Sequence, residues 1–239
     1  MKQLNLLAFD IGASNGRGII GSFDGKKMTL RPVGGFDNHF TQRGEVASWD
    51  YKGILSNLKT VFAQARAQGL APDCFGIDTW GVDYGLLDNQ GQLLENPRAY
   101  RMSSDREMHA AWALLPRRAF FDITGTAALN FNTVYQLYRR ILEDDPALKQ
   151  AAALLFMPDL LGWGLTGVKM SEYTIATTSG MLDVHTRDWS RDIIEKLGLP
   201  RHIFQRLDMP GTLRGQLSPA VAAELGTGPV PYAAVGGHD

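Results

Sequence analysis

The chain has 239 residues, of which 44% are hydrophobic and 21% charged, so it can bury a sizeable core and is neither intrinsically disordered nor fibrous. Its 24 basic and 25 acidic residues give a formal net charge of -1, which leaves no overall attraction to nucleic acid or to an anionic membrane surface. The single cysteine, Cys74, excludes an internal disulfide and a cysteine-rich metal centre and fits a reducing compartment.

The apolar runs of the chain are too short for a signal peptide or a membrane span. The first run is broken by Asn5 and stopped by Asp10, whereas a secretory signal needs a core of ~7 to 15 apolar residues and a cleavage site. The longest other run, 151–157, is far below the ~18 residues of a membrane span. We therefore expect a mature N-terminus, a cytoplasmic protein and no membrane partner.

The first third of the chain predicts strands, one helix and a further strand. Apolar runs over 4–11, 17–23 and 28–33, with an Asp24-Gly25 turn, favour three antiparallel strands. Apolar residues at i, i+3 and i+4 spacing between 54 and 65 predict an amphipathic helix capped by Asp50. A strand over 75–80 follows, and then leucine pairs on either side of a turn at 89–91 predict a small hairpin over 86–94.

Helices dominate the remainder. Apolar stripes, caps and closing glycines predict helices over 134–142, 160–165, 193–197 and 219–225. A last strand, 229–235, leads into a Gly-Gly-His-Asp turn at 236–239. We expect one α/β domain with a helix-rich insertion between roughly 97 and 212, and an end on a glycine turn favours a fragment boundary over a finished domain.

The segment 10–17, Asp-Ile-Gly-Ala-Ser-Asn-Gly-Arg, places a carboxylate at the end of one strand and an arginine at the start of the next. Its glycines let backbone N–H groups approach an anion, Ser14 and Asn15 add donors, and Arg17 supplies permanent positive charge. Asp10 can hold a hydrated magnesium ion. The segment lacks the Gly-Lys-Ser/Thr and the following helix of a Walker A loop, and an ordinary polar turn is the alternative interpretation.

Residues 12–16 also fit G-x-S-x-G, the nucleophile elbow of α/β hydrolases, with Ser14 as nucleophile. That elbow leads from a strand into a helix, whereas the sequence after Ser14 is β-like and turns at Asp24-Gly25. A hydrolase is therefore the least favoured hypothesis.

Two further polar segments follow predicted strands, where α/β folds bind ligands. At 78–83, Trp80 offers an apolar face, Gly81 lets a ligand reach the backbone, and Asp78 and Asp83 can accept hydrogen bonds from hydroxyls, which suits a polyhydroxylated ligand. At 236–239 a strand delivers Asp239 through two glycines, as a general base requires. The alternatives are a core tryptophan with turn-forming aspartates, and a frayed chain end.

These three segments resemble the N-terminal half of the sugar kinases of the FGGY family. The resemblance covers essentially the whole chain and is carried by FDIGASNGRG, GIDTWGVDYGLLD, FNTVYQLY, LLFMPDLLGWGLTG, EYTIATTSGMLD with DW soon after, and the terminal GGHD. DTWGVD followed by LLD is most similar to the branch of the family that acts on L-rhamnulose, and less similar to the xylulose, glycerol and gluconate branches.

The resemblance implies the actin-like, ribonuclease H-like ATPase fold, an α/β fold in which two domains close on ATP and sugar. Residues 1–239 would be the N-terminal domain. Its implied partner, the C-terminal kinase domain that holds the adenine, would be missing from this sequence. The implied reaction transfers the γ-phosphoryl group of ATP, with Mg²⁺, to the 1-hydroxyl of L-rhamnulose. A kinase for xylulose or fuculose and a noncatalytic sugar-binding module remain as alternatives.

The resemblance also implies roles for individual residues. Asp239 would be the catalytic base, and Asp10 would lie at the metal and phosphate end. The ATP phosphates would be contacted by Ala13, Ser14, Asn15, Gly16 and Arg17. The sugar would be contacted by Gly81, His238 and Asp239, and by Asn132 and Tyr135 from the FNTVYQLY segment.

Overall fold

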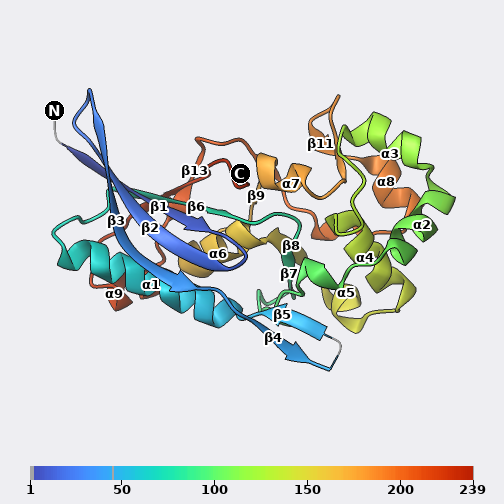
Figure 1. The fold of residues 1–239 in the computed structure, drawn as a ribbon, viewed down its shortest axis with the longest axis horizontal. Coiled ribbons are helices and arrows are strands. Elements are labelled where there is room, and N and C mark those ends of the chain that lie inside the picture. Colours follow the sequence, from blue (N-terminus) through green and yellow to red (C-terminus); the bar gives the residue numbers. More distant parts are fainter. Residues whose placement is uncertain (1–2, 45, 239) are drawn as a thin grey trace.

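The computed structural model describes residues 3–44 and 46–238. The protein has a six-stranded mixed sheet with a helical lobe at one end (Figure 1). The strands of the sheet are β1 (Leu4–Ile11), β2 (Asn15–Phe23), β3 (Met28–Asp37), β6 (Cys74–Thr79), β13 (Leu213–Gln216) and β14 (Pro231–Ala233). They lie in the order β13-β14-β6-β1-β2-β3. Since β6 is parallel to both β1 and β14, the carboxyl ends of these three strands share one edge.

The antiparallel meander predicted at the start of the chain is confirmed. β1 pairs with β2 and β2 with β3, which brings Asp10 opposite Arg17. On its other side β1 pairs in parallel with β6, which brings Asp10 opposite Asp78. This mixed sheet, flanked by helices, confirms the predicted fold class.

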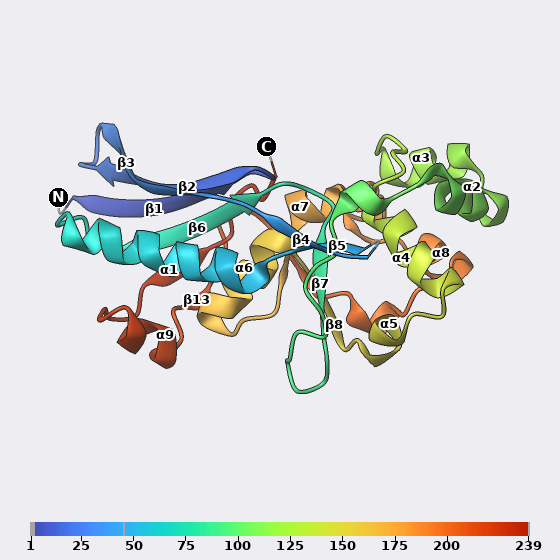
Figure 2. The same ribbon diagram turned by 60° about the horizontal axis from the view of Figure 1, so that its bottom comes forward.

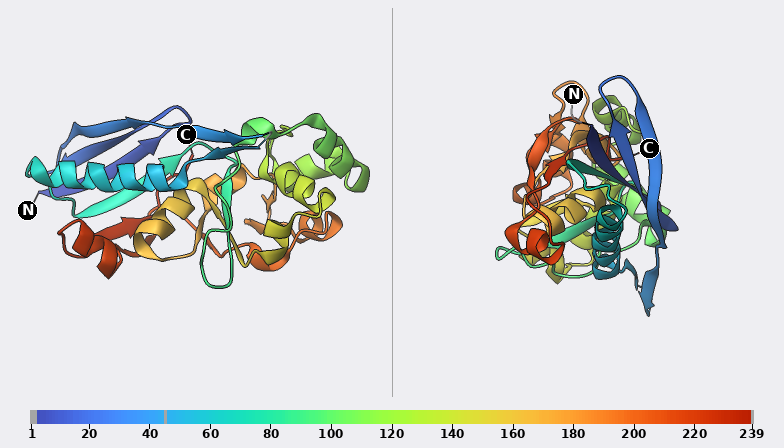
Figure 3. Two further views of the ribbon diagram at one scale, coloured as in Figure 1. Left: turned by 90° about the horizontal axis from the view of Figure 1, so that it is seen from below. Right: turned by 90° about the vertical axis from the view of Figure 1, so that its left-hand side faces the viewer.

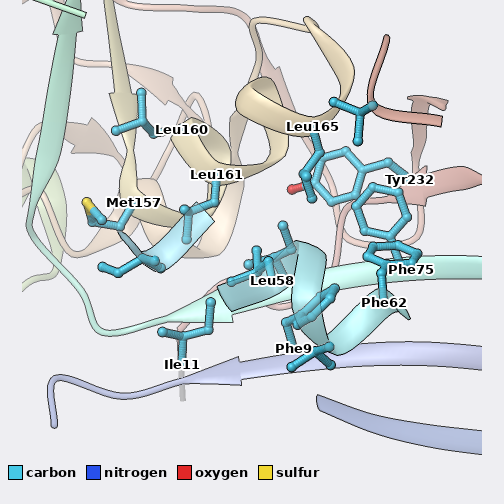
Figure 4. Packing of buried hydrophobic residues seen from close by; sticks show 14 of the residues in the cluster. Phe9, Ile11, Leu58, Phe62, Phe75, Met157, Leu160, Leu161, Leu165 and Tyr232 are labelled. Carbon is cyan, nitrogen blue, oxygen red and sulfur yellow. The ribbon is translucent and has the colours of Figure 1, made fainter. Parts of the chain in front are cut away.

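Three helices cover one face of the sheet: α1 (Tyr51–Ala67), α6 (Met157–Thr166) and α9 (Pro219–Glu224) (Figures 2 and 3). α1 is the helix predicted after Asp50, whose carboxylate accepts the N–H of Gly53 at 3.1 Å. Its apolar stripe packs against strand residues and against α6, as the positions of Leu58 and Phe62 show in Figure 4. Burying such a side chain contributes about 1.5–3 kcal/mol.

The predicted helix-rich insertion forms the lobe beside the sheet and has its own hydrophobic core. Its helices are α2 (Asp105–Leu114), α3 (Arg117–Thr124), α4 (Thr133–Leu142), α5 (Pro146–Gln150), α7 (Tyr173–Thr177) and α8 (Arg191–Lys196), with short 3₁₀ turns η1 (Tyr100–Met102) and η2 (Arg201–Ile203). Short strand pairs join them: β9 (Ser171–Glu172) with β12 (Leu207–Asp208), and β10 (Leu182–Asp183) with β11 (Asp188–Trp189). Within the described residues no helix is long and apolar enough to cross a membrane.

The small hairpin predicted over 86–94 is confirmed in minimal form: an antiparallel bridge joins Leu87 to Leu93, and the N–H of Leu94 donates to the carbonyl of Leu86 at 2.9 Å. The main partner of this strand was not predicted, since β7 (Tyr84–Leu87) pairs with β8 (Ala153–Phe156). The β7–β8 pair is buried on both faces, with Leu87 facing the sheet's core and Leu86 the core of the helical lobe. An all-apolar strand shows no alternation, so its partner cannot be read locally.

The strands around the meander include one hairpin that was not predicted, and they decide one sequence interpretation. A hairpin of β4 (Phe40–Arg43) and β5 (Val46–Trp49), which the sequence did not suggest, projects from the end of β3 (Figure 1). Ser14 lies between two antiparallel strands and not at the start of a helix, which contradicts the nucleophile elbow and with it the hydrolase hypothesis.

Candidate functional site

A cavity of about 210 Å³ opens beside the carboxyl ends of β1 and β6. It is lined by Trp80, Gly81, Val82, Tyr100, Phe131 and His238. Trp80 and Gly81 directly follow β6, and the N–H of Trp80 donates to the carbonyl of Ile11 at the end of β1 at 3.2 Å. The cavity therefore lies at the strand ends where the sequence predicted a ligand.

Gly81 and His238 are in direct contact across this cavity. A Cβ built on Gly81 would lie 2.7 Å from Cδ2 and 2.8 Å from Nε2 of the His238 ring. Only glycine permits this approach, so two residues separated by most of the chain together form one wall. Both had been predicted to contact a sugar.

His238 is held there through the preceding residue. The carbonyl of Gly237 accepts the N–H of Thr79 at 3.2 Å, which ties the turn after β14 to the end of β6. Asp239, the predicted catalytic base and sugar ligand, lies outside the described residues. Its role as the catalytic base therefore stays a proposal.

Trp80 lines the cavity, but the Asp83 carboxylate lies beneath it. Asp83 is buried, and its Oδ2 accepts the indole N–H groups of Trp49 at 2.6 Å and of Trp80 at 2.9 Å. Burial raises the pKa of Asp83 to about 6, and the indole hydrogen bonds oppose that rise. Asp83 thus fixes the Trp80 ring that faces a ligand, and it is not itself among the lining residues.

Asn132 and Tyr135 are also committed to the protein interior. Both polar atoms of the Asn132 side-chain amide are bonded to backbone: Nδ2 donates to the carbonyl of Thr178, and Oδ1 accepts the N–H of Leu129. The Tyr135 hydroxyl accepts the indole N–H of Trp112 at 3.1 Å. From this segment it is Phe131 that reaches the cavity.

Sequence reasoning missed Phe131 and Tyr100. Their rings meet edge to face, with centroids 5.7 Å apart and planes at 60°, and form an apolar wall opposite Gly81 and His238. Phe131 adjoins a predicted residue, but Tyr100 stands in a stretch without periodicity. Nothing local signalled either one.

The segment predicted to contact phosphates is a tight turn between β1 and β2. The N–H of Gly12 donates to the carbonyl of Asn15 at 2.8 Å, so that backbone donor closes the turn and does not face outwards. Asn38 fastens the turn from β3, donating from Nδ2 to the carbonyl of Gly12 and from its N–H to that of Ser14. Ala13 is half-buried, and the side chains of Ser14 and Asn15 are exposed and remain available as donors.

Gly16 has a packing reason to be glycine. A Cβ there would lie 2.4 Å from the Phe36 ring, so the residue is required by the sheet whether or not phosphate binds. Its neighbour Arg17 is exposed and pairs with Asp10, with Nη2 2.7 Å from Oδ2. An exposed ion pair of this kind contributes little to stability, which leaves both groups free to exchange partners when an anion or cation arrives.

The Asp10 carboxylate fits a magnesium ion that arrives with phosphate. Mg²⁺ keeps several waters and takes one or two protein carboxylates together with phosphate oxygens. Asp10 is half-exposed at the sheet edge. No group of three or more His, Cys, Asp or Glu suited to a metal occurs among residues 3–44 and 46–238.

A second cavity of about 200 Å³ lies against α4 and is lined by Arg98, Arg139 and Arg140 among others. Its arginines are neutralised by carboxylates: Asp145 lies 2.7 Å from Arg98 and 3.2 Å from Arg140, Glu95 lies 2.6 Å from Arg140, and Glu143 lies 2.6 Å from Arg139. Three carboxylates thus balance three arginines and leave no net charge for an anion. The cavity at Gly81 and His238 is therefore the better candidate site.

Comparisons with known proteins identify the family of this chain. Residues 5–239 match the family described as "FGGY family of carbohydrate kinases, N-terminal domain". Rhamnulokinase from Bacteroides thetaiotaomicron is 38% identical over 244 residues, covering 100% of this chain and 49% of the relative. Rhamnulokinase from Halalkalibacterium halodurans is 35% identical, covering 92% and 47%. The chain spans about half the length of the curated relatives it matches.

Solved structures share the fold at low sequence identity. Xylulose kinase from Rhodospirillum rubrum superposes with a TM-score of 0.84 at 16% identity, covering 98% of this chain and 48% of that one. Gluconate kinase from Lactobacillus acidophilus gives 0.83 at 15% identity, covering 99% and 48%. These likenesses establish the architecture and nothing about substrate.

Proposed function

This chain belongs to the FGGY family of carbohydrate kinases, and we propose that it is the sugar-binding half of an ATP-dependent kinase that phosphorylates the 1-hydroxyl of L-rhamnulose. The observation that carries the proposal is the meeting of three segments at one sheet edge. The turn with Asp10 and Arg17, the segment 80–82 and the turn with His238 all lie at the carboxyl ends of the parallel strands. A sugar in the cavity is thereby next to a place for phosphate.

In the proposed reaction, Asp239 accepts the proton of the sugar's 1-hydroxyl. The oxygen of that hydroxyl bonds to the γ-phosphorus of ATP while the bond from the γ-phosphorus to the leaving ADP breaks. His238, Gly81 and the Trp80 face hold the sugar. Ser14 and Asn15, at the turn between β1 and β2, and Arg17 of β2 donate to phosphate oxygens, and Ala13 and Gly16 shape that turn. Magnesium, when bound with ATP, supplies further positive charge against those oxygens, and Asp10 would hold it through its waters.

Two observations support L-rhamnulose among the ketoses. The curated relatives at 35% and 38% identity are rhamnulokinases. The cavity wall of Tyr100 and Phe131 includes two aromatic rings in contact, and a ring face suits the C6 methyl group of a 6-deoxy sugar better than a hydroxymethyl group. A hydroxyl buried there without a partner would cost about 1–3 kcal/mol.

Calorimetry on residues 1–239 tests the sugar. L-Fructose differs from L-rhamnulose only by a hydroxyl at C6, so we expect it to bind roughly tenfold more weakly. Phe131→Leu keeps the wall apolar and should preserve the preference, whereas Phe131→Asn should reduce it. Equal affinity for both sugars would contradict the choice of substrate and favour a kinase for a ketose without a C6 methyl group, such as xylulose.

An ADP-release assay tests the activity. It uses a polypeptide of the relatives' full length, with L-rhamnulose and Mg-ATP. Asp239→Asn should lower turnover by ~10² to 10⁴ and leave sugar affinity within a few-fold. Wild-type turnover in that variant would remove Asp239 from the mechanism. The chain of 239 residues alone should turn over very poorly, because closure of a second domain completes such sites.

A sugar-binding module without catalysis is the second candidate. L-Rhamnulose binding without any ADP release from the full-length polypeptide would support it.

A further inference from the structure

Helix α7 (Tyr173–Thr177) lies between the two segments that form the cavity wall, and it touches both. The preceding residue, Glu172, caps the helix, since its carboxylate accepts the N–H groups of Thr174 at 2.7 Å and of Ile175 at 2.8 Å. Thr174 and the residue after the helix, Thr178, are four apart and so face the same side. Neither threonine lines the cavity, yet each is bonded to a segment that does.

Thr174 holds the Gly237 end of the wall. The N–H of Gly237 lies 2.8 Å from Oγ1 of Thr174 and 3.2 Å from Oε2 of Glu172, and the Thr174 hydroxyl itself donates to that same Oε2 at 2.6 Å. A Cβ on Gly237 would come within 2.9 Å of Glu172 Oε2 and 3.0 Å of Ile175 Cβ. The close approach requires glycine, and it fixes the peptide that immediately precedes His238.

Thr178 holds the opposite end. Its Oγ1 accepts the N–H of Val82 at 3.1 Å. Val82 has a φ of 67°, a left-handed conformation that is strained for a β-branched residue, and its carbonyl accepts the Thr133 hydroxyl at 2.7 Å. Backbone held in this way keeps Gly81 in place against the His238 ring.

Buried charges anchor the start of α7 from below. The N–H of Glu172 donates to the Asp159 carboxylate at 3.1 and 3.2 Å, and Asp159 forms a buried ion pair with Arg214 of β13. Arg214 also pairs with Asp208 at 3.2 Å, on the strand beside β9. Removing one partner of such a network is costly, so the helix start is set by the sheet and does not drift.

We propose that Thr174 and Thr178 are positioning residues that set the distance between His238 and the 80–82 segment. The assignment rests on the proposed function, in which those two segments hold the sugar and the base. A base displaced by ~1 Å can lose ~10² in rate, so a hydroxyl that fixes the Gly237 peptide matters although it touches no substrate.

The test compares variants that differ by one hydroxyl in the chain of residues 1–239. Thr174→Ser keeps the hydroxyl and Thr174→Ala removes it, and both lack the γ-methyl group. We expect the amide of Gly237, followed by NMR hydrogen exchange, to exchange about five to ten times faster in Thr174→Ala than in Thr174→Ser. The His238 ring signals should shift in Thr174→Ala and return in Thr174→Ser.

Thr177 provides the matched control. It lies in the same helix, and its hydroxyl donates to the carbonyl of Thr174 at 2.6 Å. The exchange rate of the Gly237 amide and the His238 ring signals should therefore be the same in Thr177→Ala as in Thr177→Ser. Thr178→Ala against Thr178→Ser repeats the comparison for Val82, with the exchange of its amide as the readout. It also decides the matter where a Thr174 variant does not fold.

The outcomes separate this proposal from the function it rests on. Equal Gly237 exchange in Thr174→Ala and Thr174→Ser would overturn the positioning role even if wild-type chain binds L-rhamnulose. Failure of wild-type chain to bind the sugar would overturn the proposed function, while the exchange data would still support or refute the hold on Gly237. In the full-length kinase, Thr174→Ala should lower kcat by roughly ten- to a hundredfold with sugar KM within a few-fold, and Thr174→Ser should restore it.

Discussion

Replacing Asp83 by asparagine should change how stability depends on pH. The Asp83 carboxyl has its pKa raised from 3.8 to about 6, chiefly by burial. The unfolded chain therefore loses this proton at lower pH than the folded protein does. This titration does not change the free energy of unfolding below pH 4. It lowers the free energy of unfolding as pH rises from 4 to 6, and above pH 6 the reduction stays at about 3 kcal/mol.

The asparagine removes the titration and adds a hydrogen-bonding cost. An amide can offer its oxygen to the indoles of Trp49 and Trp80, but its NH₂ group then faces the side-chain donor of Gln136. A buried donor left unpaired costs about 1–3 kcal/mol at every pH. Because the wild type loses stability as Asp83 ionises and the asparagine variant does not, the stability of Asp83→Asn relative to wild type should rise by on the order of 1 kcal/mol between pH 5 and pH 8.

Urea unfolding followed by circular dichroism at pH 5, 6, 7 and 8 measures this gap. Asp24→Asn is the control, because backbone hydrogen bonds lower the pKa of exposed Asp24 and its carboxylate is ionised throughout that range. Its difference from wild type should stay flat. A gap for Asp83→Asn that is equally flat would refute a raised pKa in the folded protein.

Three other substitutions test separate parts of the site and the core. Gly81→Ala would place a Cβ 2.7 Å from the His238 ring, so sugar affinity measured by calorimetry should fall at least tenfold, and unchanged binding would contradict the contact. Arg17→Ala breaks only an exposed pair with Asp10, so urea unfolding should change by less than ~1 kcal/mol while full-length turnover falls, and a large stability loss would mean the pair is structural. Leu58→Ala empties a fully buried position in α1 and should cost about 2–5 kcal/mol in urea, whereas a loss below ~1 would contradict the core packing.

The elements predicted correctly from sequence are those whose pattern is complete within a short window. The helix α1 shows a buried stripe every three or four residues together with its own cap at Asp50, and the start of α9 is marked by Ser218, which accepts the N–H of Val221. The pairing of β7 with β8 was not predicted, for the opposite reason. Its two strands are about 70 residues apart and uniformly apolar, so neither one carries information about the other.

The site divides along the same line. Gly81 and His238 were identified from a family resemblance, and their mutual contact appears only in three dimensions. Asn132 and Tyr135 were predicted as ligands because polar groups in a family segment suggest binding, yet their polar atoms satisfy buried partners. Tyr100 and Phe131 carry no such signal, because an apolar wall is built from residues that resemble core residues in any sequence.

The cavity lies where the chain crosses between two hydrophobic cores. Trp80 belongs to the core of the sheet and Tyr84 to that of the helical lobe, and the left-handed Val82 turns the chain between them. Alternate residues of β7 and β8 then face opposite cores, so this strand pair is the wall that both share. Because close-packed cores transmit displacement, a change deep in either one reaches Gly81 through this crossing. His238 is tied through Gly237 to α7, which also holds Val82 through Thr178, and Ile175 of that helix belongs to the core of the helical lobe, so both sides of the cavity are positioned from that core.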